Sequence, residues 1–481
     1  MSLFIKKSLS ALMSQAGDSE KGLKRTLGPV NLIALGIGAI IGAGLFVRTA
    51  SAAGDAAGPA VVISYIIAGV GCAFAGLCYA EFASMIPIAG SAYAYAYVTM
   101  GEFLAWIIGW ALILEYALAA ATVSIAWSEY LNSLLGGRIP YEWCHSPWES
   151  MGGATGIMNV PAVFILVLLT LVLIKGTQES ATLNAIIVVI KVSIVLVLIV
   201  VGWGFINEAN YTPFTIPNIV GHEAWNRHGW GGVLGGASIV FFAFIGFDAV
   251  STAAQEAKNP KRDMPIGILG SLLICTILFV LFSHVLTGVA NWQEFKVAGK
   301  EASVAYAINT YMTGYGWLAT LVTVAILAGF SSVILVMLMG QSRVFYSMSK
   351  DGLVPKVFSE LHPKFRTPFK SNMILFVFVA LFAAFVPGDI AGDLTSFGTL
   401  FAFVLVCAGI WVMRVKNPEA VRPFKTPLVP LIPILGILVC SALIFSLDYV
   451  TQLSALAWLI VGLFVYFLYS KKNSVLRKGQ Q

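Results

Sequence analysis

Apolar runs of about twenty residues recur along the whole chain, and no other feature constrains its fold as strongly. A helix needs about 20 residues to cross the roughly 30 Å of hydrocarbon in a bilayer. The short alternating segments of a transmembrane barrel are absent. The twelve runs lie near residues 29–52, 59–85, 102–134, 159–175, 181–206, 231–253, 265–290, 316–339, 372–388, 394–413, 428–447 and 454–470. We therefore expect an all-α integral membrane protein with 12 transmembrane helices.

Composition supports one membrane domain with short tails. Of the 481 residues 58% are hydrophobic and only 11% are charged, whereas soluble domains carry about 25% charged residues. We expect a tail at residues 1–28 with no cleaved signal peptide, a single transmembrane domain at 29–470, and a tail at 471–481. Residues 2–13 can form an amphipathic helix on the membrane surface, or they belong to an ordinary tail.

The distribution of positive charge predicts the orientation. If every run crosses the membrane, 23 of the 29 Lys and Arg residues lie on the side of the N-terminus and five on the other side. Lys and Arg concentrate on the cytoplasmic side of membrane proteins. Both termini are therefore predicted to be cytoplasmic, in a multi-pass protein of the plasma membrane.

Glycines interrupt the first apolar run between Leu35 and Phe46, which reads LGIGAIIGAGLF. An unpaired backbone group in hydrocarbon costs several kcal/mol, so a broken helix at membrane depth indicates backbone that faces a cavity. The other interpretation is that Gly36, Gly38, Gly42 and Gly44 permit close helix packing. Their spacing does not match the G-x-G-x-x-G pattern of a dinucleotide site.

The sixth run, near residues 231–253, carries a glycine and a carboxylate near mid-membrane, Gly246 and Asp248, within its segment Ser238–Thr252. Broken helices five spans apart are expected if five helices are repeated in inverted orientation, with a binding site between the breaks. The repeats would cover about residues 29–206 and 231–413, and the helices at 428–470 would lie outside them.

Lys191 lies far from either end of the fifth run, and an intramembrane charge is a functional candidate. Burial disfavours its charged form and nearby carbonyls favour it, so it can bind and release a proton. Ser331 and Ser332 can accept from its ammonium, or they can bond back to their own helix. We assign Lys191, Gly38, Ser331 and Ser332 to a proton-coupling site; the alternative for Lys191 is a fixed cation that holds helices together.

Three further ionisable groups lie within runs. Glu115 can attract a cationic group of a substrate, carry a proton, or bond to a neighbouring helix. Asp248 can contact the ligand or cap the broken sixth helix. Glu81 lies toward the inner end of its run, which favours gating or packing over substrate binding.

Nothing in the sequence indicates an enzyme. The six cysteines show neither a disulfide framework nor metal-ligand spacing. We find no nucleophile–base pair, phosphate loop or metal cluster, and we expect no cofactor and no nucleic-acid partner.

Several segments together resemble the amino acid–polyamine–organocation transporter superfamily. They are Gly38–Phe46 (GAIIGAGLF), the YAEF and PIAGSAY motifs at Tyr79–Tyr93, and Phe242–Asp248 (FAFIGFD). Three others are similar to its cationic amino acid transporter branch, in the bacterial form with twelve spans: Glu256–Ile268 (EAKNPKRDMPIGI), Arg343–Pro355 (RVFYSMSKDGLVP) and Phe424–Pro430 (FKTPLVP). The resemblance covers nearly the whole chain.

The resemblance implies a LeuT-like fold with alternating access and a site for an amino acid. The α-carboxylate would bind amides around Gly42, Ala43 and Gly44, at a helix N-terminus. The α-amino group would meet carbonyls of Ile40 or Ile41 and of Phe244, Ile245 and Phe247, beside Gly246. Lys191 takes the place of a sodium ion of sodium-coupled relatives, which favours proton coupling. Leu321 would line the side-chain pocket and exclude long cationic side chains, while Glu115 matches a glutamate of the family.

We therefore expect a proton-coupled symporter that imports L-amino acids, either small neutral ones such as alanine or cationic ones. The first alternative is an amino acid exchanger in which Lys191 stays charged. The second is a membrane sensor that binds amino acids without translocating them. Oligomeric state is not encoded in any pattern that we recognise.

Overall fold

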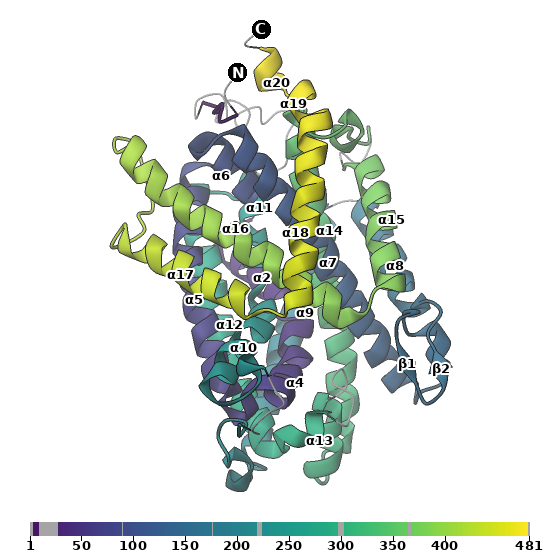
Figure 1. The fold of residues 1–481 in the computed structure, drawn as a ribbon. Helices are drawn as coiled ribbons and strands as arrows, with labels where there is room; N and C mark the ends of the chain where they lie inside the picture. Colours follow the sequence, from purple (N-terminus) through teal and green to yellow (C-terminus); the bar gives the residue numbers. More distant parts are fainter. Residues whose placement is uncertain are drawn as a thin grey trace.

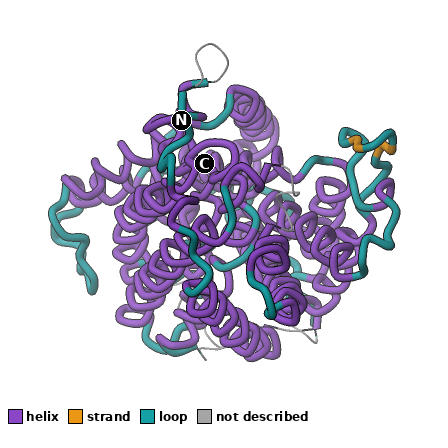
Figure 2. Tube along the Cα trace, turned by 90° about the horizontal axis from the view of Figure 1, so that it is seen from below, coloured by secondary structure: helices purple, strands orange, loops and turns teal. Residues whose placement is uncertain are grey.

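Long helices run between two ends of the molecule in a computed structural model, and both termini lie at the same end (Figure 1). We call this the near end and the opposite one the far end. The structure describes residues 3–8, 27–88, 90–175, 177–218, 224–296, 303–363 and 367–479. Viewed from the far end, the helices pack into one bundle, and a two-stranded sheet of β1 (Ser150–Met151) and β2 (Ala154–Thr155) lies at its periphery (Figure 2).

Each of the twelve predicted apolar runs holds helix. The main helices are α2 (Pro29–Ile40), α5 (Val61–Met85), α7 (Glu102–Leu134), α8 (Val160–Lys175), α9 (Thr177–Trp203), α10 (Gly229–Phe241), α12 (Pro260–Val289), α14 (Gly316–Lys350), α15 (Phe369–Phe385), α16 (Gly388–Lys416), α17 (Leu431–Ser446) and α18 (Tyr449–Val465). The shorter ones are α3 (Ala43–Phe46), α4 (Arg48–Ala52), α6 (Ser91–Thr99), α11 (Ala249–Thr252), α13 (Ser303–Tyr311), α19 (Lys471–Asn473) and α20 (Val475–Lys478). Among the described residues, eight helical segments are long and apolar enough to cross a membrane, and four shorter apolar helices accompany them.

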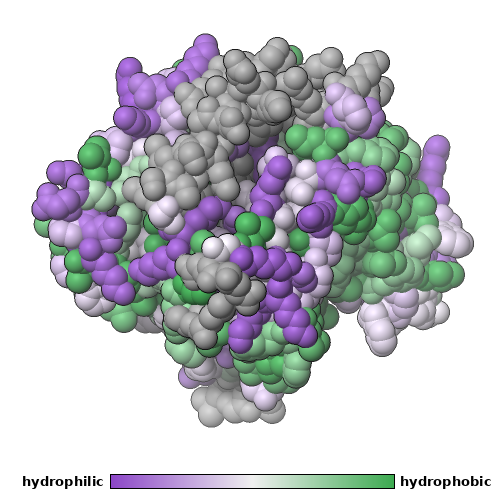
Figure 3. All heavy atoms as spheres, turned by 90° about the horizontal axis from the view of Figure 1, so that it is seen from above, coloured by the Kyte–Doolittle hydropathy of each residue, from purple (hydrophilic) through white to green (hydrophobic). Residues whose placement is uncertain are grey.

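The near end presents hydrophilic side chains, whereas hydrophobic ones dominate the flanks visible in the same view (Figure 3). Residues 3–8 lie here as turn and coil, and the rest of the predicted amphipathic helix lies outside the described residues. The carbonyl of Ile5 accepts from the Glu102 amide at 2.9 Å, and Lys7 Nζ donates to Asp351 Oδ1 at 2.6 Å. The N-terminal segment is thus fastened to the ends of α7 and α14.

Glu102, the first residue of α7, is fully buried, and its carboxylate accepts from donors in the C-terminal part of the chain. Its carboxylate accepts from Tyr466 OH at 3.0 Å, from Arg477 Nε at 2.5 Å and from the Ser474 hydroxyl. Burial acts to lower the pKa of the Arg477 guanidinium, but the hydrogen bond and charge of Glu102 raise it overall. Arg477 also reaches the carbonyl of Leu3 at 3.4 Å. We call these contacts the Glu102 cluster.

Glu81 joins α5 to the end of α16 and to the connection that follows it, 333 and 341 residues away in sequence. Its side chain is fully buried on α5 and accepts from Arg414 at 2.8 and 2.9 Å and from Arg422 Nε at 3.1 Å. The amide of Thr426 donates to the same carboxylate at 2.8 Å. The predicted packing role of Glu81 is therefore an ion cluster between α5, α16 and the connection to α17.

Tryptophans fasten α18 to α7. The indoles of Trp110 and Trp458 stack at 4.7 Å, and each donates to the backbone carbonyl of the other residue, at 2.8 and 3.2 Å. Trp106 donates to the carbonyl of Gly462 at 2.9 Å. These bonds satisfy indole N–H groups that would otherwise be unpaired in an apolar environment.

Candidate substrate and proton site

The first apolar run is broken where its glycines predict. Helix α2 ends at Ile40, Ile41 has extended backbone (φ −76°, ψ 101°), and α3 begins at Ala43. Within the part of the chain that the structure describes, the amides of Gly42–Gly44 and the carbonyl of Ile40 take part in no hydrogen bond. The ends of a helix leave such groups unpaired unless a cap or a ligand satisfies them.

The sixth run is broken as well. Helix α10 passes into a 3-10 turn at Phe242–Phe244, and α11 begins only at Ala249. Gly246 has φ +114°, a backbone conformation that favours glycine. The carbonyls of Phe244, Ile245 and Phe247 accept no hydrogen bond from any described residue.

The two breaks lie against each other. A Cβ added to Gly44 would lie 2.2 Å from Ala243 Cα, and one added to Gly246 would lie 2.7 Å from Ala39 Cβ. Unpaired amides of one segment and unpaired carbonyls of the other therefore gather in one buried region. Amide donors match an anionic group of a ligand and carbonyl acceptors match a cationic one.

The close-packing interpretation of the glycines also holds. A Cβ added to Gly36 would lie 2.3 Å from Ser271 Oγ, and one added to Gly42 would lie 2.7 Å from Val333 Cγ2. The first span therefore both breaks and packs tightly, against a different neighbour at each glycine.

Substitution of Gly44 by alanine tests the contact between the breaks. The added methyl meets the backbone of Ala243, which cannot rotate away, so we expect a loss of about 1–3 kcal/mol. The melting temperature of the purified protein should fall. Gly28→Ala is the matched control, because Gly28 has φ −90° and no atom within 4 Å of the added Cβ. Equal melting temperatures for both variants would contradict the packing of the two breaks.

Lys191 lies beside the first break, as its proposed role requires. Its side chain is 1% exposed, and Nζ donates to the carbonyls of Gly38 and Ile41, both at 2.7 Å. In an unbroken helix these carbonyls would accept from amides four residues on. The ammonium takes the place of those amides, and it lies at the C-terminal end of α2, where the helix dipole favours a cation.

The two serines do not accept from Lys191, so that part of the prediction is wrong. Ser331 is half-buried and bonds back to the Leu327 carbonyl at 2.8 Å, the alternative noted for it. Ser332 is buried and donates to Asn184 Oδ1. Asn184 was not among the predicted site residues, although it lies seven residues before Lys191 and hence on the same face of α9.

Glu115 and Asp248 form a buried acidic pair. Both side chains are fully buried, and Glu115 lies beside Asp248 and Thr399. Neither Glu115 oxygen has a partner within hydrogen-bond geometry among the described residues. Asp248 Oδ2 accepts from Tyr116 OH at 2.7 Å, but its side chain makes no bond that caps α11. The pair therefore retains acceptors for a proton or for a donor on a ligand.

Leu321 does not line this region, so its predicted place is wrong. It is 50% exposed, on the same exposed face of α14 as Trp317 and Val324. Ser332 lies three helical turns farther along the same side of α14, where the helix is buried and the Ser332 hydroxyl donates to Asn184. The part of α14 that carries Leu321 therefore faces outward from the bundle, whereas the part near Ser332 is buried.

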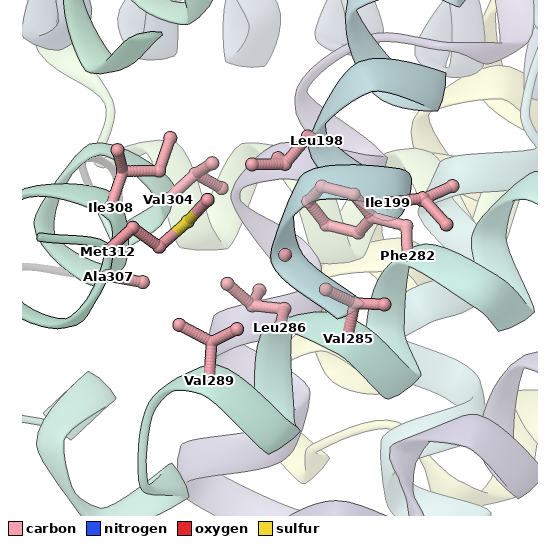
Figure 4. A pocket seen from close by; sticks show the side chains of 11 residues that line it. Leu198, Ile199, Phe282, Val285, Leu286, Val289, Val304, Ala307, Ile308 and Met312 are labelled. Atoms are coloured by element: carbon pink, nitrogen blue, oxygen red, sulfur yellow. The ribbon is translucent and has the colours of Figure 1, made fainter. Parts of the chain in front are cut away.

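An apolar cavity lies farther along the bundle, between α9, α12 and α13, with side chains such as Leu198, Phe282 and Met312 pointing into it (Figure 4). The described residues that line it are hydrophobic apart from one glycine, Gly202. A charged ligand would lose its hydration there without replacement, so the cavity does not compete with the broken helices as a site for a zwitterion.

The described residues include no group of three or more His, Cys, Asp or Glu side chains that could hold a metal ion. The unpaired backbone groups, the Lys191 ammonium and the acidic pair are thus the chemical groups that the site offers.

Comparison with known proteins agrees with a transport site. The model of the amino acid permease family matches residues 27–469. The chain is 44% identical to the branched-chain amino acid permease BcaP of Bacillus subtilis (strain 168), over 99% of both chains. It is 42% identical to the methylthioribose transporter of the same organism, over 99% of this chain and all of the relative. It is 33% identical to the vacuolar cationic amino acid transporter 4 of Arabidopsis thaliana, over 87% of this chain and 68% of that one.

Proposed function

Because this chain belongs to the amino acid permease family, we propose that it imports L-amino acids across a bacterial plasma membrane by proton-coupled symport. The match covers both broken helices and Lys191. The family and its relatives bear the names of permeases and transporters, which favours transport over catalysis.

The arrangement that we propose is LeuT-like. Twelve crossings would form two inverted repeats, at residues 29–206 and 231–413, followed by two further helices at 428–470. The near end would face the cytoplasm, because most Lys and Arg residues fall on that side. Two observations support this arrangement. Each of the twelve runs contains a helix, and the first and sixth runs are interrupted.

The unpaired backbone at the two breaks is the observation that carries the proposal. The amides of Gly42–Gly44 would bind the α-carboxylate of an amino acid. The carbonyls of Ile40, Phe244, Ile245 and Phe247 would bind its α-amino group. Ile41 is the exception among the predicted acceptors, because its carbonyl already accepts from Lys191.

Lys191 would carry the coupled proton. When it is charged it ties the end of α2 to α9 through Gly38 and Ile41. Loss of the proton weakens both bonds, because a charge-assisted hydrogen bond is roughly twice as strong as a neutral one. The proton would thereby favour one conformation of the broken helix over another, which coupling requires.

The relatives leave more than one substrate class open. Their names include branched-chain and cationic amino acids and also methylthioribose. The unpaired backbone groups suit any α-amino acid, and the free acceptors of Glu115 suit a cationic side chain. We therefore include small neutral, branched-chain and cationic amino acids in the proposal.

Purified protein in liposomes tests the function. A symporter accumulates labelled alanine, leucine or arginine only under an inward proton gradient. An exchanger requires amino acid inside the vesicles, and a sensor gives no uptake under any gradient. Unlabelled amino acids and methylthioribose, added as competitors, define the substrate class. If uptake requires internal amino acid and does not depend on the proton gradient, the protein is an exchanger and the symport proposal is wrong.

A further inference from the structure

A cavity with three polar residues in a mostly apolar described lining opens on the near-end side of Lys191, between α2, α9 and α14. It encloses about 510 Å³ when the part open to solvent is counted, and Asn31, Asn184 and Glu256 are its polar lining residues. Asn31 is exposed at one side of it, and Asn184, which is 4% exposed, lies at the other. The space inside it that water can reach is about 30 Å³, and one water molecule needs about 10–15 Å³, so the cavity has room for water.

On α2 and α14 the described lining stops about one turn short of Gly38 and of Ser332, the partner of Asn184. On α2 it ends at Leu35, three residues before Gly38. On α14 it begins at Leu335, three residues after Ser332. On α9 the described residues that line it are Asn184 and Ala185, about two turns before Lys191. Helical side chains tilt toward the N-terminus of their helix, so Lys191 extends toward Asn184.

Asn184 joins this cavity to the ammonium. A Cβ on Gly38 would lie 2.7 Å from its Nδ2, and the carbonyl of Gly38 accepts from Lys191. Ser332 donates to Asn184 Oδ1. The Asn184 amide nitrogen donates to no described residue, so it is free to bind a water molecule in the cavity.

Glu256 supplies a carboxylate at the same cavity. Its Oε1 accepts from Arg343 Nη2 at 2.6 Å, and its side chain is 13% exposed. Its backbone carbonyl accepts from the amide of Leu27, just before α2, at 2.9 Å. A carboxylate that lines a cavity attracts protons that leave a buried base through it.

We propose that this cavity is the route by which the Lys191 proton reaches the near-end solution, with Asn184 as a positioning residue that holds water beside Gly38. The proton passes from Lys191 Nζ to that water and leaves past the Glu256 carboxylate. The inference rests on the proposed proton coupling. It assigns Asn184 and Glu256 a part in proton release and none in binding the amino acid.

Net uptake and exchange separate proton release from substrate binding. A symporter must release its proton inside before the empty carrier returns, whereas exchange returns the carrier loaded and still protonated. We expect Asn184→Leu, which removes the polar group at similar size, to slow gradient-driven net uptake of labelled leucine or alanine at least tenfold. Exchange against internal unlabelled amino acid at equal pH should stay within twofold of the unsubstituted protein.

Three further variants make the test specific. Asn184→Ser keeps a hydroxyl, and net uptake should stay within threefold of the unsubstituted protein. Met339→Leu changes the apolar wall of the same cavity and should alter neither rate. Glu256→Gln should slow net uptake more than exchange. Unchanged net uptake in Asn184→Leu, or equal loss of net uptake and exchange, would overturn the release route while the symport proposal stands. If the unsubstituted protein only exchanges, the symport proposal fails and the release route fails with it.

Discussion

Lys191→Met abolishes proton-driven accumulation if the proposed coupling is correct. Methionine has a similar length but cannot bind a proton, so the carbonyls of Gly38 and Ile41 lose their donor. A gradient of two pH units supports at most about 100-fold accumulation when one proton moves with each substrate, at about 1.4 kcal/mol per unit. In liposomes we expect the variant to reach a ratio near one between inside and outside.

Lys425→Met is the control for the loss of a positive charge, because Lys425 is exposed near the connection to α17. It should accumulate substrate as the unsubstituted protein does. A size-exclusion profile and a thermal melt separate a coupling defect from misfolding. If a folded Lys191→Met protein still accumulates amino acid under the gradient, the proton is carried elsewhere, with Glu115 and Asp248 as the next candidates.

Glu81→Ala should destabilise the protein by about 3–5 kcal/mol, the usual cost of removing one partner from a buried ion pair. Arg422 stays buried, with a side chain only 4% exposed, and loses its anion. Arg414 loses its bidentate partner, and the amide of Thr426 loses its acceptor. Thermal unfolding of the purified protein measures the effect.

An exposed pair gives the matched comparison. Glu360 and Lys370 lie 2.6 Å apart, but both side chains are more than half exposed, at 52% and 58%. Exposed pairs contribute about 0–1 kcal/mol, so Glu360→Ala should melt close to the unsubstituted protein. Replacing Glu81, Arg414 and Arg422 together by methionine should recover part of the loss. Equal effects of Glu81→Ala and Glu360→Ala would show that the Glu81 cluster contributes no more than a surface pair.

The broken helices could be predicted because glycines and a carboxylate are conspicuous inside apolar runs. Gly42 and Gly246 both lie in the non-helical segments. Lys191 could be predicted as a functional residue as well, because charged residues within membrane spans are rare and are usually functional. The acceptors of its hydrogen bonds could not be predicted, because they are the backbone carbonyls of Gly38 and Ile41 in another part of the chain. The polarity of Ser331 and Ser332 suggested acceptors, but the fold brings the break of α2 to Lys191 instead.

The orientation of a transmembrane helix is hard to predict, and Leu321 illustrates the reason. In a soluble protein the exposed face of a helix is polar, so the pattern reveals which side is buried. In a membrane both faces are apolar, because lipid and protein core accept the same side chains. Nothing local distinguishes the half-exposed Leu321 from the buried Val322 that follows it.

Long-range ion pairs were also out of reach. Glu81 could be placed near one end of its run, but its partners Arg414 and Arg422 lie 333 and 341 residues away. Charge patterns within one helix carry information about neighbours three or four residues apart. They carry none about which distant loop folds back to neutralise a carboxylate.

The Glu102 cluster has a consequence for the order in which the molecule is assembled. Arg477, the only cation bonded to Glu102 among the described residues, is added to the nascent chain 375 residues later. At about 5–20 residues per second, a ribosome takes roughly 20–75 s to cover that distance. The Glu102 carboxylate at the start of α7 must therefore remain hydrated, or be shielded by a partner protein, until synthesis is nearly complete. Burial of this carboxylate is thus one of the last steps of biogenesis.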